Sequence, residues 1–235
     1  TQNTLESNIK NTITDKEIQV ASVIVNPENG AVISLVGGVD YAKSQYNRAL
    51  SSKRQVGSTM KPFLYYAALE NGFTSASTFL SEETTFNFEN SSTYSPSNYN
   101  NIYAHKDISM AAAIAYSDNI YAVKTHLFLG EDTLVNTAYT CGITSKLNQN
   151  PSLALGTSEL NMMDFATGYT TLASNGYKKD LYFIEKIEDL NEFKLRTEDI
   201  KSASGIEERS RSILALHNPK YIVNKNPCSQ LIRDL

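Results

Sequence analysis

A serine and a lysine three positions apart are the residues of this sequence best suited to covalent chemistry. They are Ser58 and Lys61, in the run Gly57-Ser58-Thr59-Met60-Lys61. On a helix, side chains at positions i and i+3 lie on the same face, so the hydroxyl and the amine can meet. A serine hydroxyl is a weak nucleophile until a neighbouring base removes its proton, and a lysine can do so when its pKa is lowered. The spacing therefore predicts a serine nucleophile with a lysine base.

The context of this pair is more informative than its spacing. Ser7 and Lys10 have the same spacing, but they lie within a predicted amphipathic helix without a preceding glycine, and we interpret them as a solvated face. Gly57 permits close approach of the backbone. Ser58 stands at the start of a predicted helix, where backbone N–H groups can stabilise an oxyanion.

Ser117-Asp118-Asn119 is the second polar motif, and it is the only Ser-x-Asn in the sequence. It interrupts two predicted apolar helices, over residues 107–116 and 120–128. Side chains of these types compete for backbone hydrogen bonds, so the break is well placed to present polar groups into a cleft. An exposed polar kink is the alternative. With the serine and lysine above, the motif satisfies the first two elements of the S-x-x-K, S-D-N, K-T-G set of penicillin-interacting serine enzymes.

Longer stretches around these motifs make the resemblance specific. Over about residues 18–190 the sequence resembles the transpeptidase domain of class A penicillin-binding proteins. The similar stretches occur in that family in the same order, and here they are residues 36–41, 44–49, 54–63, 94–99, 115–119 and 154–176. Collinear matches of this kind are hard to obtain by chance.

The resemblance implies a role for each motif residue. Ser58 would be acylated by the penultimate D-Ala of a peptidoglycan stem peptide, and an amine from a second stem would attack the acyl-enzyme. Lys61 would be the general base, and Ser117 would relay a proton to the leaving amine. Asn119 would hold Lys61 and the amide carbonyl of the substrate. Asp118 is expected to be structural.

The resemblance also implies binding residues and partners. The backbone N–H of Ser58 would supply half of the oxyanion hole, and Gly57, Thr157 and Ser158 are expected to line the substrate site. The implied partners are peptidoglycan stem peptides and β-lactam antibiotics. The implied location is the extracytoplasmic bacterial cell envelope, with a membrane anchor outside this chain. No cofactor or metal is implied.

The implied fold class is α/β (α+β), with an antiparallel sheet packed against helices and a mainly helical lobe. We assign residues 1–235 to one such domain, with a poorly matched tail over 201–235. No K-T-G follows Ser117, so the third motif is expected at or beyond Leu235, and the sheet is expected to be incomplete. The chain would then be a fragment, a decayed gene product, or a chain completed by another segment.

The missing motif leaves other functions open. A D,D-carboxypeptidase would differ only in the acceptor. A catalytically silent β-lactam-binding or cell-wall module is the alternative from another class. A β-lactamase is a poor interpretation, because the E-x-x-L-N pattern that supplies a deacylating carboxylate is absent.

Composition excludes several other classes. The net charge of −4 has no long block of either sign, which argues against nucleic-acid binding. The longest apolar stretches are far short of the roughly 20 residues that span a bilayer. Cys141 and Cys228 have no CxxC spacing, and the three histidines lack ligand spacing, so neither a metal cluster nor a disulfide scaffold is indicated.

Hydrophobic periodicity predicts the elements that position the motifs. Helices are expected over residues 4–13, 58–70 and 160–174, in addition to the pair that flanks the Ser-Asp-Asn motif. Hairpins are expected from residues 20–25 with 31–36, around Asn29-Gly30, and from residues 182–187 with 192–196. Residues 75–101 should form a long, mostly extended surface connection.

Overall fold

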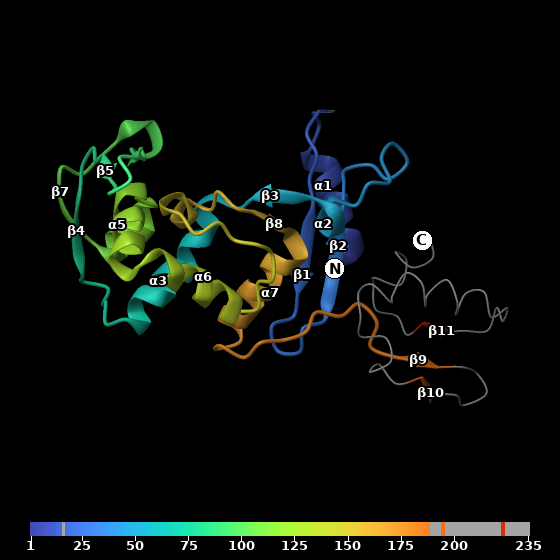
Figure 1. The fold of residues 1–235 in the computed structure, drawn as a ribbon. Coiled ribbons are helices and arrows are strands. Elements are labelled where there is room, and N and C mark those ends of the chain that lie inside the picture. Colours follow the sequence, from blue (N-terminus) through green and yellow to red (C-terminus); the bar gives the residue numbers. More distant parts are fainter. Residues whose placement is uncertain (16, 189–193, 196–221, 224–235) are drawn as a thin grey trace. The chain divides into compact units, whose positions relative to one another are not determined.

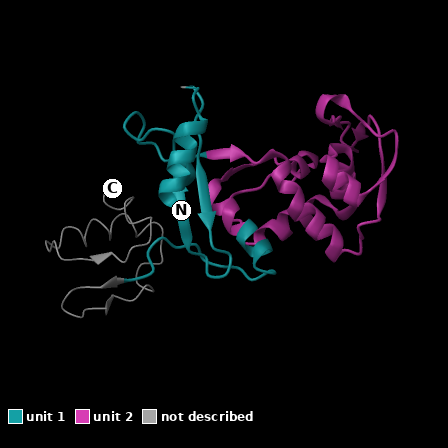
Figure 2. Ribbon diagram, turned by 180° about the vertical axis from the view of Figure 1, so that it is seen from behind, with its two compact units in different colours: residues 1–52, 169–235 teal, residues 53–168 magenta. Residues whose placement is uncertain are grey.

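The computed structural model describes residues 1–15, 17–188, 194–195 and 222–223 of the 235-residue chain. The chain divides into two compact units, residues 1–52 with 169–235 and residues 53–168 (Figure 2). Helices and small antiparallel sheets alternate along the sequence (Figure 1), as the predicted α/β (α+β) class requires. The sheet expected for that class is incomplete in the described part of the chain, where β1 and β2 form a two-stranded sheet.

The first unit is built on the predicted hairpin. β1 (Ser22–Val25) pairs antiparallel with β2 (Val32–Val36), and Gly30 in the connecting turn has φ +81°. The predicted first helix is α1 (Gln2–Thr12). The side-chain amide of Gln2 donates to the carbonyl of Leu35 at 2.9 Å and accepts from its N–H at 2.9 Å. A helix side chain therefore satisfies backbone groups of β2 that no described strand pairs.

Shorter elements complete this unit. α2 (Arg48–Ser51) is capped by Asn47, whose side chain accepts from two backbone N–H groups. Of the hairpin predicted from 182–187 and 192–196, the structure has β9 (Ile187–Glu188) paired antiparallel with β10 (Lys194–Leu195), whereas residues 183–186 are not in a strand. β11 (Ile222–Val223) pairs with the other edge of β9. Most of the predicted tail over 201–235 lies outside the described residues.

The second unit contains both motifs that the sequence analysis predicts to be catalytic. Its helical elements include α3 (Lys61–Glu70), α5 (Asn119–Leu129) and α6 (Glu131–Thr140), which pack on one another. Aromatic and aliphatic side chains fill the space between α3, α4 (Met110–Tyr116) and α5. This core contains Tyr65, Ala68, Met110, Ala113 and Tyr121. The helices adjacent to the two motifs are therefore packed against one another in a common core.

The remaining elements of this unit are short. β3 (Lys53–Gln55) pairs with β8 (Glu159–Asn161), β4 (Thr78–Ser81) pairs with β7 (Lys106–Ser109), and β5 (Phe86–Asn87) pairs with β6 (Thr93–Tyr94). Three 3₁₀ turns, η1 (Gly57–Met60), η2 (Tyr99–Asn101) and η3 (Pro151–Leu155), join them to the helices. The expected extended connection over 75–101 thus holds three short strands.

Two predicted helices are replaced by strands at their N-terminal ends, and one helix was not predicted. Residues 106–109 pair as β7, so the helix expected from 107 begins at Met110, with Ser109 as its N-cap. The helix expected from 160 begins at Met162, because residues 159–161 form β8; this helix, α7, ends at Ala173. The helix α6 was not predicted. In the first two cases strand pairing outweighs local helical periodicity. Pairing with a distant strand cannot be predicted from short-range sequence patterns.

Candidate active site

The start of α3 places the serine and the lysine on one face. η1 turns directly into α3, and the N–H of Lys61 donates to the carbonyl of Ser58. Residues at i and i+3 eclipse in a 3₁₀ turn, which aligns the two side chains. Pro62 lies in the first turn of α3, where its missing N–H costs nothing. Met60, with no exposed surface, anchors the turn in the core, so Ser58 is exposed while Lys61 is buried.

Lys61 reaches the Ser-Asp-Asn motif with its terminal amine. Its Nζ donates to the carbonyl of Ser117 at 2.7 Å and to Oδ1 of Asn119 at 2.7 Å, and it lies 3.0 Å from Oγ of Ser117. Lys61 thus contacts residues 56 and 58 positions further along the chain, and the two motifs meet as the family resemblance implied. The hydroxyl of Ser58 has no hydrogen-bond partner among the residues that the structure describes, and Ser58 is an exposed residue.

Burial sets the protonation state of this lysine. Only 4% of its surface is exposed, and desolvation lowers its pKa from 10.5 to about 8, against the opposing charge of Asp118. Two of its three partner atoms are carbonyl oxygens, which only accept hydrogen bonds, whereas the third is a hydroxyl that can donate or accept. A neutral amine can therefore donate to both carbonyls and keep a lone pair with which to accept a proton.

The break between α4 and α5 has a defined geometry. Ser117 ends α4 in the left-handed region, with φ +53°, and Asp118 is the N-cap of α5. The Oδ1 of Asp118 accepts from the N–H of Tyr121 at 2.7 Å, and its Oδ2 accepts from the hydroxyl of Ser81 at 2.5 Å. Asp118 is buried, in agreement with its expected structural role, whereas Ser117 is exposed and Asn119 is half-buried, so the break is polar and only partly exposed.

Asn98 is a supporting residue that the motif analysis did not single out. Its Oδ1 accepts from the N–H of Asn119 at 2.7 Å, and its Nδ2 donates to Oδ2 of Asp118 at 2.7 Å. The preceding carbonyl, of Ser97, accepts from Nδ2 of Asn119 at 2.7 Å, which turns Oδ1 of Asn119 toward the amine of Lys61. The only sequence signal for Asn98 was its position in the family-like stretch 94–99. Its contacts with Asp118 and Asn119 became evident only from the tertiary structure.

The three predicted substrate-binding residues lie on two segments that touch. The N–H of Gly57 donates to the carbonyl of Gly156 at 3.1 Å, next to Thr157. The hydroxyl of Thr157 bonds that of Ser152 at 2.8 Å. Ser158 is buried, and its hydroxyl accepts from the N–H of Asn148 at 2.9 Å. Their contact with substrate remains a prediction.

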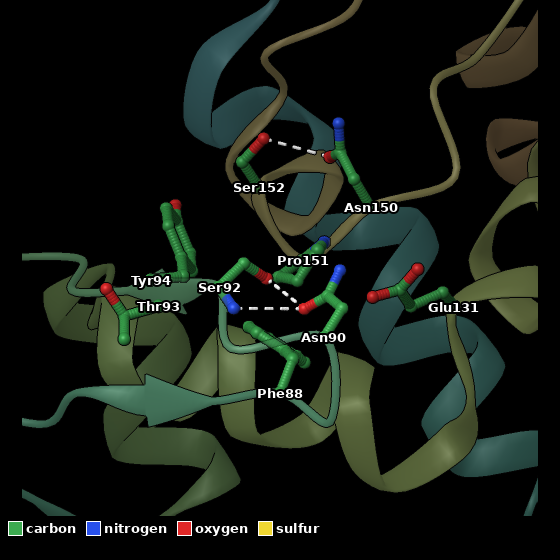
Figure 3. Close-up of a pocket in the computed structure, with 9 residues that line it drawn as sticks. All are labelled: Phe88, Asn90, Ser92, Thr93, Tyr94, Glu131, Asn150, Pro151 and Ser152. Atoms are coloured by element: carbon green, nitrogen blue, oxygen red, sulfur yellow. Dashed lines mark hydrogen bonds between the residues drawn. The ribbon is translucent and has the colours of Figure 1, made fainter.

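A separate groove of about 450 Å³ lies on the second unit, between the β5–β6 hairpin, the start of α6 and the start of η3 (Figure 3). Within it, Asn90 accepts from the N–H and the hydroxyl of Ser92, and Ser152 donates to Asn150. None of the predicted site residues is among those that line it, which are Phe88, Asn90, Ser92, Thr93, Tyr94, Glu131, Asn150, Pro151 and Ser152.

Other chemistry-bearing residues form no second centre in the described ranges. No group of three or more His, Cys, Asp or Glu side chains there could hold a metal ion. His126 is a core residue whose ring contacts the carbonyl of Asn150, and burial lowers its pKa. Cys141 is buried, whereas Cys228 and His217 lie outside the described residues. No helix among the described residues has the length and apolar character to cross a bilayer.

Comparison with known proteins decides the family. The family model of the penicillin-binding protein transpeptidase domain matches residues 20–213. The chain belongs to this family. Penicillin-binding protein 2D of Bacillus subtilis is 49% identical over 174 residues, and penicillin-binding protein 1A of Escherichia coli is 37% identical over 176 residues. Each match covers 74% of this chain, but only 25% and 20% of the respective relative.

Solved structures agree on the transpeptidase fold. The crystal structure of penicillin-binding protein 1A from Haemophilus influenzae superposes with a TM-score of 0.71 at 30% identity, covering 75% of this chain and 26% of that one. PonA1 of Mycobacterium tuberculosis, in complex with penicillin V, shares the fold with a TM-score of 0.69 at 22% identity, covering 84% and 55%. The predicted resemblance to class A penicillin-binding proteins is thereby confirmed.

Proposed function

We propose that the chain carries the acylation half of a peptidoglycan D,D-transpeptidase site, with Ser58 as nucleophile. The observation that carries the proposal is the buried amine of Lys61 held by Ser117 and Asn119, three residues from an exposed serine. Family membership supports the same reaction class. The substrate would be a stem peptide in the cell envelope, outside the cytoplasm.

The first step uses the amine as a base. Neutral Lys61 accepts the hydroxyl proton of Ser58 as Oγ bonds to the carbonyl carbon of the penultimate D-Ala. The resulting oxyanion accepts a hydrogen bond from the N–H of Ser58. The amide C–N bond then breaks, and Ser117, 3.0 Å from the lysine amine, passes a proton to the departing D-Ala nitrogen.

The second step reverses the proton path. An amine of a second stem peptide attacks the ester carbon and loses its proton through Ser117 to Lys61. The ester C–O bond then breaks, and Lys61 returns a proton to Oγ of Ser58, which regenerates the free serine and the neutral amine. Asn119 keeps the lysine in place throughout. A β-lactam would acylate Ser58 by the same first step, with its ring nitrogen taking the proton.

Labelling with a fluorescent penicillin, followed by intact mass, tests the proposal. We expect one adduct on the parent chain, none on Ser58→Ala, and an undiminished adduct on Ser7→Ala, the matched control at the other Ser-x-x-Lys. Retention of the adduct in Ser58→Ala would assign the wrong nucleophile. No adduct on a folded parent would refute acylation by this chain and would identify it as an inactive fragment, whereas an adduct without turnover would identify a catalytically silent β-lactam-binding module.

If the parent chain is acylated, a second assay distinguishes transfer of the acyl group to an amine from its hydrolysis. Incubation with a stem peptide and an added amine acceptor should yield the cross-linked product. Hydrolysed stem peptide without cross-linked product, in the presence of the added acceptor, would instead identify a D,D-carboxypeptidase.

A further inference from the structure

Two glycines from distant parts of the sequence meet beside the nucleophile. Gly57 precedes Ser58 in η1, and Gly156 follows η3. Both have positive φ, +60° and +68° respectively, and the N–H of Gly57 donates to the carbonyl of Gly156 at 3.1 Å. The backbone on which Ser58 sits therefore rests directly on another backbone segment.

The contact leaves no room for a side chain at position 156. A Cβ there would lie 2.1 Å from the carbonyl oxygen of Gly57, 2.5 Å from its nitrogen and 2.8 Å from its carbonyl carbon. All three atoms belong to the backbone, so no change of side-chain rotamer can relieve the clash. A Cβ on Gly57 itself would meet nothing within 4 Å. A side chain is therefore excluded at position 156 but not at position 57. A side chain at 156 would push on the peptide that links Gly57 to Ser58.

That peptide holds the group that acts on the oxyanion. The carbonyl of Gly57 and the N–H of Ser58 belong to one planar unit, so a displaced carbonyl turns the N–H with it. We propose that Gly156 is a positioning residue that sets the direction of the Ser58 N–H. The inference rests on the proposed function, in which this N–H stabilises the oxyanion.

η3 is held firmly enough to exert this control. The hydroxyl of Ser152 bonds the hydroxyl of Thr157 at 2.8 Å and donates to Oδ1 of Asn150 at 2.9 Å. Leu153 and Ala154 have no exposed surface, and η3 packs against α5. A group added at Gly156 must therefore move the Gly57–Ser58 peptide, because the opposite side is fixed.

The test compares Gly156→Ala with Gly72→Ala. Gly72 also has positive φ, +87°, but a Cβ there meets nothing within 4 Å, so this control carries the backbone strain without the contact. Amide resonances of Gly57 and Ser58 are recorded in the full chain labelled with ¹⁵N at glycine and serine. Acylation by penicillin is measured alongside, with its rate constant separated from the dissociation constant of the initial complex.

We expect the two amide resonances to move in Gly156→Ala and to stay in place in Gly72→Ala. The acylation rate constant should fall by about 10- to 100-fold with little change in initial binding, because an oxyanion donor acts on the transition state. Unmoved amide resonances, or a loss confined to initial binding, would overturn the proposal.

Failure of the proposed function has a different signature. A parent chain that is not acylated refutes that function, while the amide resonances still decide the role of Gly156. If Gly156→Ala does not fold, Ser152→Ala, which loosens η3 without a clash, replaces it. Movement of the Ser58 amide in that variant supports the proposal, and its absence overturns it.

Discussion

The pKa of Lys61 leads to a pH dependence that can be worked out in advance. Desolvation lowers this pKa to about 8 from 10.5. At pH 7 a lysine with the ordinary value is neutral in about 0.03% of molecules, whereas a pKa of about 8 makes about 9% neutral. Burial therefore raises the population of the proposed base about 300-fold. The acylation rate should rise about tenfold per pH unit below 8 and level off above it.

Two measurements check this reasoning. The first is the second-order rate constant for labelling by a fluorescent penicillin between pH 5.5 and 9.5, corrected for penicillin hydrolysis. The second is direct titration of the lysine Cε resonances in ¹³C-labelled chain, with the Lys61 signal assigned by its loss in Lys61→Arg.

The direct titration does not depend on catalysis. A Lys61 midpoint near 10.5 would refute the desolvation argument, whatever the acylation data show. A midpoint near 8 with a flat acylation profile would instead remove Lys61 from the role of base. A substitution of Asp118 by Asn provides a sign test: the charge of Asp118 raises this pKa, so its removal should move the midpoint lower.

Three further predictions concern stability, each measured by urea unfolding. Asn98→Ala deletes a buried side-chain amide and with it the 2.7 Å hydrogen bond from the backbone N–H of Asn119. This change should lower the free energy of unfolding by about 2–4 kcal/mol. Burial raises the pKa of Asp164, but hydrogen bonds from Ser145 and Thr144 outweigh this effect and lower the pKa below 3.8. Asp164→Asn should therefore cost about 1–3 kcal/mol above pH 4, a difference that disappears as pH falls through the lowered value. Gly168→Ala places a Cβ 2.9 Å from Phe63, and overpacking should cost about 1–3 kcal/mol despite better helix propensity.

Controls make these predictions specific. Asn87→Ala, at an exposed position of β5, should change stability by less than about 0.5 kcal/mol. An equal loss in Asn98→Ala and Asn87→Ala would contradict the buried-network argument. A pH-independent loss in Asp164→Asn would show that its charge is not the stabilising feature, and an unchanged Gly168→Ala would show that the core there can relax.

The sequence by itself predicted the proposed chemistry and much of the local structure. Ser58 and Lys61 at i and i+3 after a glycine, and a Ser-Asp-Asn break between helices, follow from side-chain periodicity and hydrogen-bonding preference. The first hairpin follows from its Asn-Gly turn. Collinear family-like stretches then gave the reaction class. Each of these properties depends on neighbours within a few residues or on order along the chain.

The tertiary structure decided the contacts between distant segments. No spacing rule places the side chain of Asn98 between Asn119 and Asp118, or Gly156 on the backbone of Gly57. The pairing that converts residues 106–109 and 159–161 into strands is likewise nonlocal. The lowered pKa of Lys61 depends on burial by the folded core, so it exists only once these segments have come together.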